Sequence, residues 1–208
     1  EPAKLRNIQW HCFFSNEAKK NLYTDNMKKI LYNNTYNYLT DIFENAPAKN
    51  IMDRTFYTDL KAYLPECLLV KMDIASMANS LEARSPFLDH KVLEFSASLP
   101  SAWKLHGLTT KYILKKTFKK FLPKEILHRG KMGFGIPLGK WFMGDWKNYF
   151  REIVLSEKAI NRGYFKRATI EQMFYEHISG KRDHGYRMWA LLMLELWHKV
   201  YMDGENLC

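Results

Sequence analysis

Four features that this chain of 208 residues lacks exclude several classes of protein. Cysteine occurs only at Cys12, Cys67 and Cys208, without metal-ligand spacing, so we expect no disulfide framework and a reducing, cytoplasmic location. The histidines are scattered, and no metal centre is expected. The best apolar run, residues 189–194, is far shorter than the about 20 residues that cross a bilayer, so no membrane span is expected. The first residues show no basic segment followed by an apolar one, which predicts no signal peptide.

Apolar, aromatic and basic residues are what the sequence has in quantity. Apolar residues make up 47% of the chain and aromatic residues 15%, which excludes a disordered tail and predicts a packed core. The formal net charge of +10 favours an anionic partner: nucleotide phosphates, pyrophosphate, nucleic acid or an acidic membrane. Basic residues cluster between Lys111 and Lys131, but charge alone does not choose among these partners.

The spacing of apolar residues and helix breakers predicts a string of helices. Ser15 is a good N-cap for the first, and Thr24 can cap a second that runs to about Glu44. Pro65 suits the first turn of a helix whose dense apolar residues predict burial on most sides. No stretch alternates long enough to predict a strand, and further helices are expected at about 51–64, 90–99, 109–123, 123–128, 145–156, 169–179 and 185–202.

The segment from Lys71 to His90 places charged side chains where this apolar helix is expected to stop. Glu82 and Arg84 lie there between apolar residues, and the proline that follows disfavours continued helix. Asp89 comes next and is placed to cap the following helix. On residue type alone, the favoured interpretation of Glu82 and Arg84 is an ion pair that braces the fold, because edge pairs are common and weak.

The segment Arg129–Pro137 is rich in glycine and carries Lys131. Glycine lets a backbone come close to a ligand, and lysine is a mobile point charge suited to phosphate. A solvated loop lysine is nevertheless the favoured interpretation of Lys131 on residue type alone. The residue types by themselves therefore do not make this loop a site.

The order of short motifs along the chain resembles the asparagine synthetase family. An aspartate-leucine-lysine, leucine-proline and leucine-valine-lysine series occupies residues 59–71, and glutamate-x-arginine-x-proline-phenylalanine-leucine-aspartate occupies residues 82–89. A lysine-tyrosine-isoleucine-leucine-lysine run follows at residues 111–115, and a lysine-x-glycine-phenylalanine loop at residues 131–134. The tail at residues 182–194 is similar to bacterial and archaeal members. Four motifs in the right order are far more specific than a lone glycine motif.

The resemblance implies ATP-dependent amide formation, with aspartate, ATP and ammonia from glutamine as partners and ATP with Mg²⁺ as the cofactor. The family joins the β-carboxylate of aspartate to the α-phosphorus of ATP, and ammonia then attacks the acyl-adenylate. The resemblance implies that Lys131 meets the pyrophosphate or the charge developing at the α-phosphate, and that Glu82 handles the proton of ammonia. Support for the site is expected from further residues of the first segment: Arg84, Asp89, Asp73 and Lys71.

Several elements of that family are missing from these residues. The pyrophosphate-binding serine-glycine-glycine-x-aspartate-serine loop is absent, and no two glycines are adjacent. The later segment that helps to bind ATP and magnesium is absent too, as is the glutaminase domain with its terminal cysteine. We therefore expect the back half of a synthetase domain, as a fragment, a truncated reading frame or a degenerate product. By itself it is expected neither to hydrolyse glutamine nor to make asparagine.

The expected fold class is all-α for this chain, the helical C-terminal portion of an α/β synthetase domain of the adenine-nucleotide α-hydrolase-like (ATP pyrophosphatase) type. Residues 1–144 are expected to be the C-terminal part of the synthetase domain, and residues 145–208 a helical tail packed on it. In the family this portion packs on a parallel sheet that lies upstream. A stand-alone chain should therefore expose an apolar face, to be covered by the missing N-terminal half or by self-association.

Functions of other classes remain open at the level of sequence. A basic helical module with interspersed aromatics could bind nucleic acid, although no recognised nucleic-acid motif is present and this alternative is less favoured. A non-catalytic scaffold remnant is the other, because the ATP loop is missing. Within the enzyme class, a β-lactam-forming synthetase uses the same adenylation with an internal amine. Residues 85–90 and 131–137 resemble the asparagine-forming branch, or its relatives in polysaccharide gene clusters, more closely.

Overall fold

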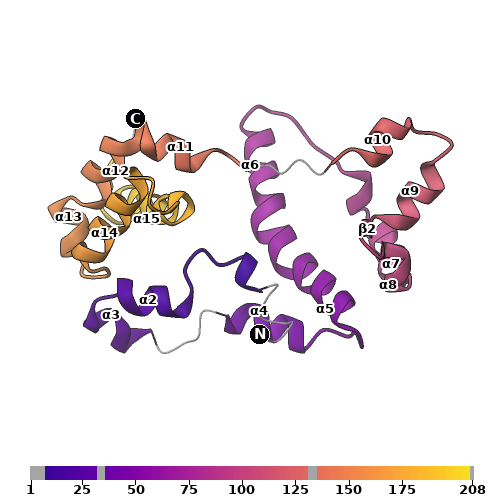
Figure 1. The fold of residues 1–208 in the computed structure, drawn as a ribbon, viewed down its shortest axis with the longest axis horizontal. Helices are drawn as coiled ribbons and strands as arrows, with labels where there is room; N and C mark the ends of the chain where they lie inside the picture. Colours follow the sequence, from indigo (N-terminus) through magenta and orange to yellow (C-terminus); the bar gives the residue numbers. More distant parts are fainter. Residues whose placement is uncertain (1–7, 32–35, 131–134, 207–208) are drawn as a thin grey trace. The chain divides into compact units, whose positions relative to one another are not determined.

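The protein is described from a computed structural model, which places residues 8–31, 36–130 and 135–206 (Figure 1). The chain divides into two compact units, which we call the first unit (residues 1–8 and 38–133) and the second unit (residues 9–37 and 134–208). Apart from one two-stranded hairpin, the placed residues are helical or irregular, which confirms the expected all-α class. The two units do not coincide with the ranges 1–144 and 145–208, whose assignment to a synthetase domain and its tail stays a prediction.

The second unit contains the main apolar core. Helices α12 and α15 pack on each other and on α11 (Figure 1). Bulky side chains such as Phe142, Phe150 and Met188 are completely buried between them. The elements of this unit are α2 (Asn16–Leu22), α3 (Asp25–Ile30), α11 (Leu138–Met143), α12 (Trp146–Val154), α13 (Glu157–Asn161), α14 (Arg167–Ile178), α15 (Gly185–Trp197) and the π-helical η3 (His198–Met202).

The two predicted N-caps near the start of the chain are confirmed. The Ser15 side chain accepts a hydrogen bond from the backbone of Ala18 at 3.2 Å, and that of Thr24 accepts one from Met27 at 3.3 Å. The helix predicted from Thr24 to about Glu44 was wrong, because α3 ends at Ile30 and Leu31 has non-helical torsion angles. The sequence that follows is rich in asparagine, which competes for backbone hydrogen bonds and disfavours helix.

The first unit is built along one long helical run. Helix α5 (Ile51–Thr58) continues without a break through the π-helical η1 (Asp59–Leu69) into α6 (Val70–Met77) (Figure 1). The prediction that Pro65 begins a helix was wrong, since it lies inside η1. Proline has no N–H to donate and its ring collides with the carbonyl four residues earlier in an α-helix. The wider π-helical winding is a known way to accommodate such a break in the hydrogen-bond ladder.

The rest of the first unit consists of short elements. Its hairpin corrects the expected helix at about 109–123, because the β-branched pair Thr109–Thr110 forms a strand and the helix starts only at Tyr112. Gly107, with φ of +56°, makes the reversal between the strands possible. These elements are α4 (Asn37–Glu44), the 3₁₀ turn η2 (Pro86–Leu88), α7 (His90–Ser98), α8 (Ser101–Lys104), β1 (Leu105–His106), β2 (Thr109–Thr110), α9 (Tyr112–Phe118) and α10 (Lys124–His128).

The apolar residues of α6 are exposed rather than buried. Met72, Ile74 and Met77 are 53%, 64% and 58% exposed, so the expected burial of this helix was wrong. An apolar pattern predicts what a helix can bury, and the described residues of the first unit do not cover these side chains. In the second unit, Trp146 and Trp189 pack against the apolar core, whereas Trp141 and Trp197 are exposed. No helix among the placed residues is both long and apolar enough to cross a membrane.

Candidate functional site

The end of α6 directs the chain into the segment that carries Glu82. The N–H of Leu81 donates to the carbonyl of Ser76 and the N–H of Ser80 to that of Met77, both at 2.9 Å. This pair of bonds is a Schellman motif, and it requires the left-handed conformation that Ser80 adopts, with φ of +56°. A serine there is strained, because its Cβ crowds the backbone. The helix is thereby closed two residues before Glu82.

Glu82 and Arg84 form an ion pair with each other. The Nε of Arg84 donates to Oε1 of Glu82 at 2.5 Å. Their side chains are 86% exposed for Arg84 and 69% exposed for Glu82. Water screens such a pair, which makes it worth at most about 1 kcal/mol. The pair therefore orients the carboxylate of Glu82 without enclosing it.

Asp89 closes the segment on its other side by capping α7. Its Oδ1 accepts hydrogen bonds from the backbone N–H groups of Lys91 at 2.9 Å and Val92 at 3.4 Å. Ser85 is extended, as the following proline predicts, and η2 turns the chain into the cap. Both ends of the Glu82 segment are thus fixed by local backbone geometry. The expected cap is confirmed, and a further role of Asp89 in supporting an ATP site stays a prediction.

The other predicted site residues are not gathered around Glu82 by the described structure. Asp73 and Lys71 lie on the exposed surface of α6, and the Asp73 carboxylate makes no ion pair with any residue that the structure places. Lys131 lies outside the described residues. Glu82 and Arg84 are therefore the predicted pair that the structure brings into contact, and the pairing of Glu82 with Lys131 stays a prediction.

Sequence reasoning missed the contact that anchors α7 and α8 to the long helix. The Nζ of Lys104 lies 3.1 Å from Oδ1 of Asp53 and donates to the carbonyl of Ala97 at 3.1 Å. Burial alone would raise the pKa of Asp53, but hydrogen bonds from Asn50 and Lys104 outweigh it and hold that pKa below its ordinary value. The Asn50-x-x-Asp53 cap is visible in the sequence. The sequence does not indicate that Lys104, 51 residues away, is the partner of Asp53.

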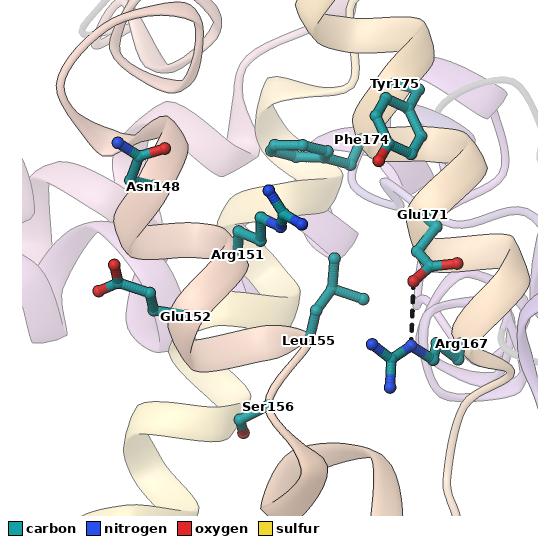
Figure 2. A pocket seen from close by; sticks show the side chains of 9 residues that line it. All are labelled: Asn148, Arg151, Glu152, Leu155, Ser156, Arg167, Glu171, Phe174 and Tyr175. Atoms are coloured by element: carbon teal, nitrogen blue, oxygen red, sulfur yellow. Dashed lines mark hydrogen bonds and ion pairs between the residues drawn. The ribbon is translucent and has the colours of Figure 1, made fainter.

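The second unit has a polar groove that contains none of these residues. Figure 2 shows it between α12 and α14. Its volume is about 400 Å³. The guanidinium of Arg151 points into it, and Arg167 opposite is held by Glu171 at 3.0 Å and Glu157 at 2.7 Å. The Arg167 charge is therefore already compensated. We assign no part of the predicted chemistry to this groove.

The described residues do not form a metal centre. No group of three or more histidine, cysteine, aspartate or glutamate side chains in residues 8–31, 36–130 and 135–206 is placed to hold a metal ion. These side chains therefore do not by themselves hold the Mg²⁺ that the resemblance implies, and most of its ligands are expected outside this chain.

Comparison with known families decides where this chain belongs. The family model described as asparagine synthase matches residues 4–199. The chain belongs to the asparagine synthase family. It is 27% identical over 205 residues to asparagine synthetase [glutamine-hydrolyzing] 1 of Bacillus subtilis, covering 97% of this chain and 31% of the relative. It is 36% identical over 152 residues to a putative asparagine synthetase [glutamine-hydrolyzing] of Mycobacterium bovis, covering 72% of this chain and 23% of the relative.

A vertebrate relative is also similar to this chain, and here too the match covers only part of the relative's length. The asparagine synthetase [glutamine-hydrolyzing] of Gallus gallus is 34% identical over 132 residues, covering 58% of this chain and 23% of the relative. The chain thus spans between about a fifth and a third of the length of these three relatives. No solved structure matches the chain.

Proposed function

We propose that this chain is the part of an ATP-dependent asparagine synthetase that contributes Glu82 and Lys131 to the synthetase site. The observation that carries the proposal is the Glu82–Arg84 pair, held between a closed helix end and a capped helix start in a member of this family. The relatives are named glutamine-hydrolysing asparagine synthetases. The substrates are accordingly aspartate, ATP and ammonia from glutamine, and the products are asparagine, AMP and pyrophosphate.

Two displacements make up the reaction. An oxygen of the aspartate β-carboxylate attacks the α-phosphorus of ATP, forming the acyl-adenylate while pyrophosphate leaves. Ammonia then attacks the acyl carbon, loses a proton, and expels AMP. In this proposal Glu82 accepts the proton from the attacking ammonia, and Arg84 orients the Glu82 carboxylate. Lys131 neutralises charge on the departing pyrophosphate.

These residues alone do not complete the site. A carboxylate that is 69% exposed is surrounded by water, which weakens its interaction with any bound group. The uncovered face of α6 lies next to it in the sequence and is apolar at Val70, Ile74 and Met77, which recur at the i, i+4 and i+7 spacing of one helix face. We propose that the portion of the synthetase present in the longer relatives covers this face, in the cytosol, and encloses Glu82. A second copy of the chain is the alternative covering.

The test transplants this chain into the Bacillus subtilis relative, in place of the 205 residues that it matches. Asparagine and AMP should form in equal amounts from aspartate, ATP and glutamine, and Glu82→Gln should lower the rate by about 100-fold. The matched control is Glu94→Gln, because Glu94 is an exposed carboxylate on α7 outside the pair. Its rate should stay unchanged.

Two outcomes would contradict the proposal. A chimaera that folds and retains glutaminase activity but forms no AMP with aspartate would show that these residues cannot serve the reaction. That result would favour the scaffold alternative. Equal activities of the Glu82→Gln and Glu94→Gln proteins would remove Glu82 from the site.

A further inference from the structure

A second cavity lies in the second unit, apart from every residue assigned to adenylation. It has a volume of about 340 Å³ and lies between α2 and the corner where α14 leads to α15. Its walls are fixed to each other, since Thr169 donates to the carbonyl of Asn21 at 3.1 Å and Arg187 donates through Nε to the carbonyl of Phe13 at 2.9 Å. The cavity is therefore a built feature of the helix packing around α2.

Two arginines supply positive charge to this cavity. Arg187 is half-buried, with its guanidinium carbon 5.6 Å from the centre of the Phe14 ring, and only its Nε is engaged by the backbone. Burial, and secondly the nearby charge of Arg182, lower the pKa of Arg187. Neither guanidinium makes an ion pair with any carboxylate in the described part of the chain. Arg187 is the half-buried cation of the two, whereas Arg182 is exposed. A half-buried cation without a counter-ion is unfavourable, and a ligand carboxylate would relieve that cost.

One free carboxylate faces the same cavity from α2. Glu17 lines it and makes no ion pair with a described residue. The other acid in the wall, Glu176, is already engaged, by His184 at 2.9 Å and Gln172 at 3.0 Å. His184 is buried, which lowers its pKa and leaves the imidazole neutral near pH 7. The uncompensated charges are thus Glu17 on one element and two arginines on others, and they do not touch.

We propose that this cavity binds a small zwitterion, an amino acid, with its carboxylate at Arg187 and Arg182 and its ammonium at Glu17. A simple anion would meet repulsion from Glu17 and Glu176, and a simple cation would meet repulsion from both arginines. A molecule that carries both charges satisfies both walls at once. The volume lies at the lower end of the range of small-molecule sites, about 300–1,000 Å³, which suits a compact ligand.

The test uses amide NMR shifts of the 208-residue chain with three zwitterions of increasing charge separation: glycine, β-alanine and γ-aminobutyrate. Acetate and methylammonium are the single-charge controls. At least one zwitterion should give saturable shifts in residues 14–22, 169–176 and 182–187, and should bind at least about tenfold more tightly than either control. Glu17→Gln and Arg187→Gln should each weaken it by about tenfold. Glu152→Gln and Arg151→Gln, exposed on α12, should leave it unchanged.

Three results would overturn the proposal. They are the absence of saturable shifts with all three zwitterions, acetate binding as tightly as the best of them, or an unchanged affinity in Glu17→Gln. The last variant keeps the test decisive if Arg187→Gln fails to fold, because Glu17 is an exposed residue and its replacement by glutamine keeps the size of the side chain. The adenylation site plays no part in any of these measurements. The proposed function can therefore fail independently.

Discussion

Replacing Gly185 by alanine should destabilise the second unit by about 2 kcal/mol. A Cβ at Gly185 would lie 2.7 Å from the backbone nitrogen of Gly139 and 3.0 Å from its Cα. Those contacts are with backbone, so the beginning of α11 must move away from α15. Overpacking of this kind costs about 1–3 kcal/mol.

The start of α11 is held where it is, which keeps the cost high. His184 donates its backbone N–H to Nδ1 of His177 at 3.0 Å, so the ring proton of His177 is on Nε2 and is donated to the carbonyl of Gly139 at 3.0 Å. His177 is completely buried, as is Phe142 on α11. Stretching the hydrogen bond from His177 to Gly139 adds about 1 kcal/mol or more to the loss of stability. The higher helix propensity of alanine returns at most about 1 kcal/mol.

The matched control is Gly139→Ala, which adds a Cβ to the other glycine of the same contact. The three atoms nearest to a Cβ at Gly139 all belong to the carboxylate of Asp183, the first at 3.0 Å, and that side chain is 79% exposed and can turn away. Turning loses the Asp183 cap on the N–H of Gly185, which alanine's helix propensity roughly offsets. Gly139→Ala should therefore change stability by less than about 1 kcal/mol.

Urea unfolding of the 208-residue chain, followed by tryptophan fluorescence, measures both variants. Only Trp103 lies in the first unit, so the signal reports mainly on the second. Equal losses in the two variants, or a Gly185→Ala protein within about 0.5 kcal/mol of the parent, would refute the reasoning. Such a result would mean that α11 shifts freely and that the His177 bond does not restrain it.

Three further perturbations follow from local geometry. Ser80→Gly should stabilise the first unit by about 1 kcal/mol by removing left-handed strain, and a lower urea midpoint by far-ultraviolet circular dichroism would contradict this. Asp89→Ala should cost about 1 kcal/mol while Asp89→Asn keeps the cap, and faster amide exchange in α7 of the alanine variant alone is the readout. Hydrogen bonds from Arg162 and Lys158 lower the pKa of Asp203 from its ordinary value of 3.8 to about 2. Because the folded value is the lower one, this stabilisation is complete above the ordinary value and lost as the pH falls toward 2, and a carboxyl NMR midpoint at 3.8 would refute it.

Features that depend on neighbouring residues could be predicted from the sequence. Ser15, Thr24 and Asp89 cap helices because each side chain bonds an N–H two or three residues ahead. Their geometry is therefore complete within one turn of chain. The extended Ser85 follows from the proline beside it for the same reason.

Predictions failed where a partner distant in sequence, or its absence, decides the outcome. The strand at Thr109–Thr110 exists because Leu105–His106 pairs with it. Pro65 is retained inside a helix because the flanking turns wind more widely around it, which no local rule for proline anticipates. The Lys104–Asp53 pair likewise depends on how the chain returns to α5. Apolar density on α6 correctly indicated a face that can be buried, and only the structure showed it uncovered.

The candidate site shows the same division between local and distant causes. The turn that presents Glu82 is encoded between Ser76 and Asp89, and it forms in the described chain with the bonds that close α6 and cap α7 in place. What the segment lacks is enclosure, because electrostatic catalysis gains its strength from groups held away from water. The exposed apolar face of α6 and the exposed carboxylate of Glu82 follow one another in the chain. A single covering surface would therefore bury the apolar face and also exclude water from the Glu82 carboxylate. In the proposed function, the apolar residues of α6 would bind the surface that makes Glu82 an effective proton acceptor.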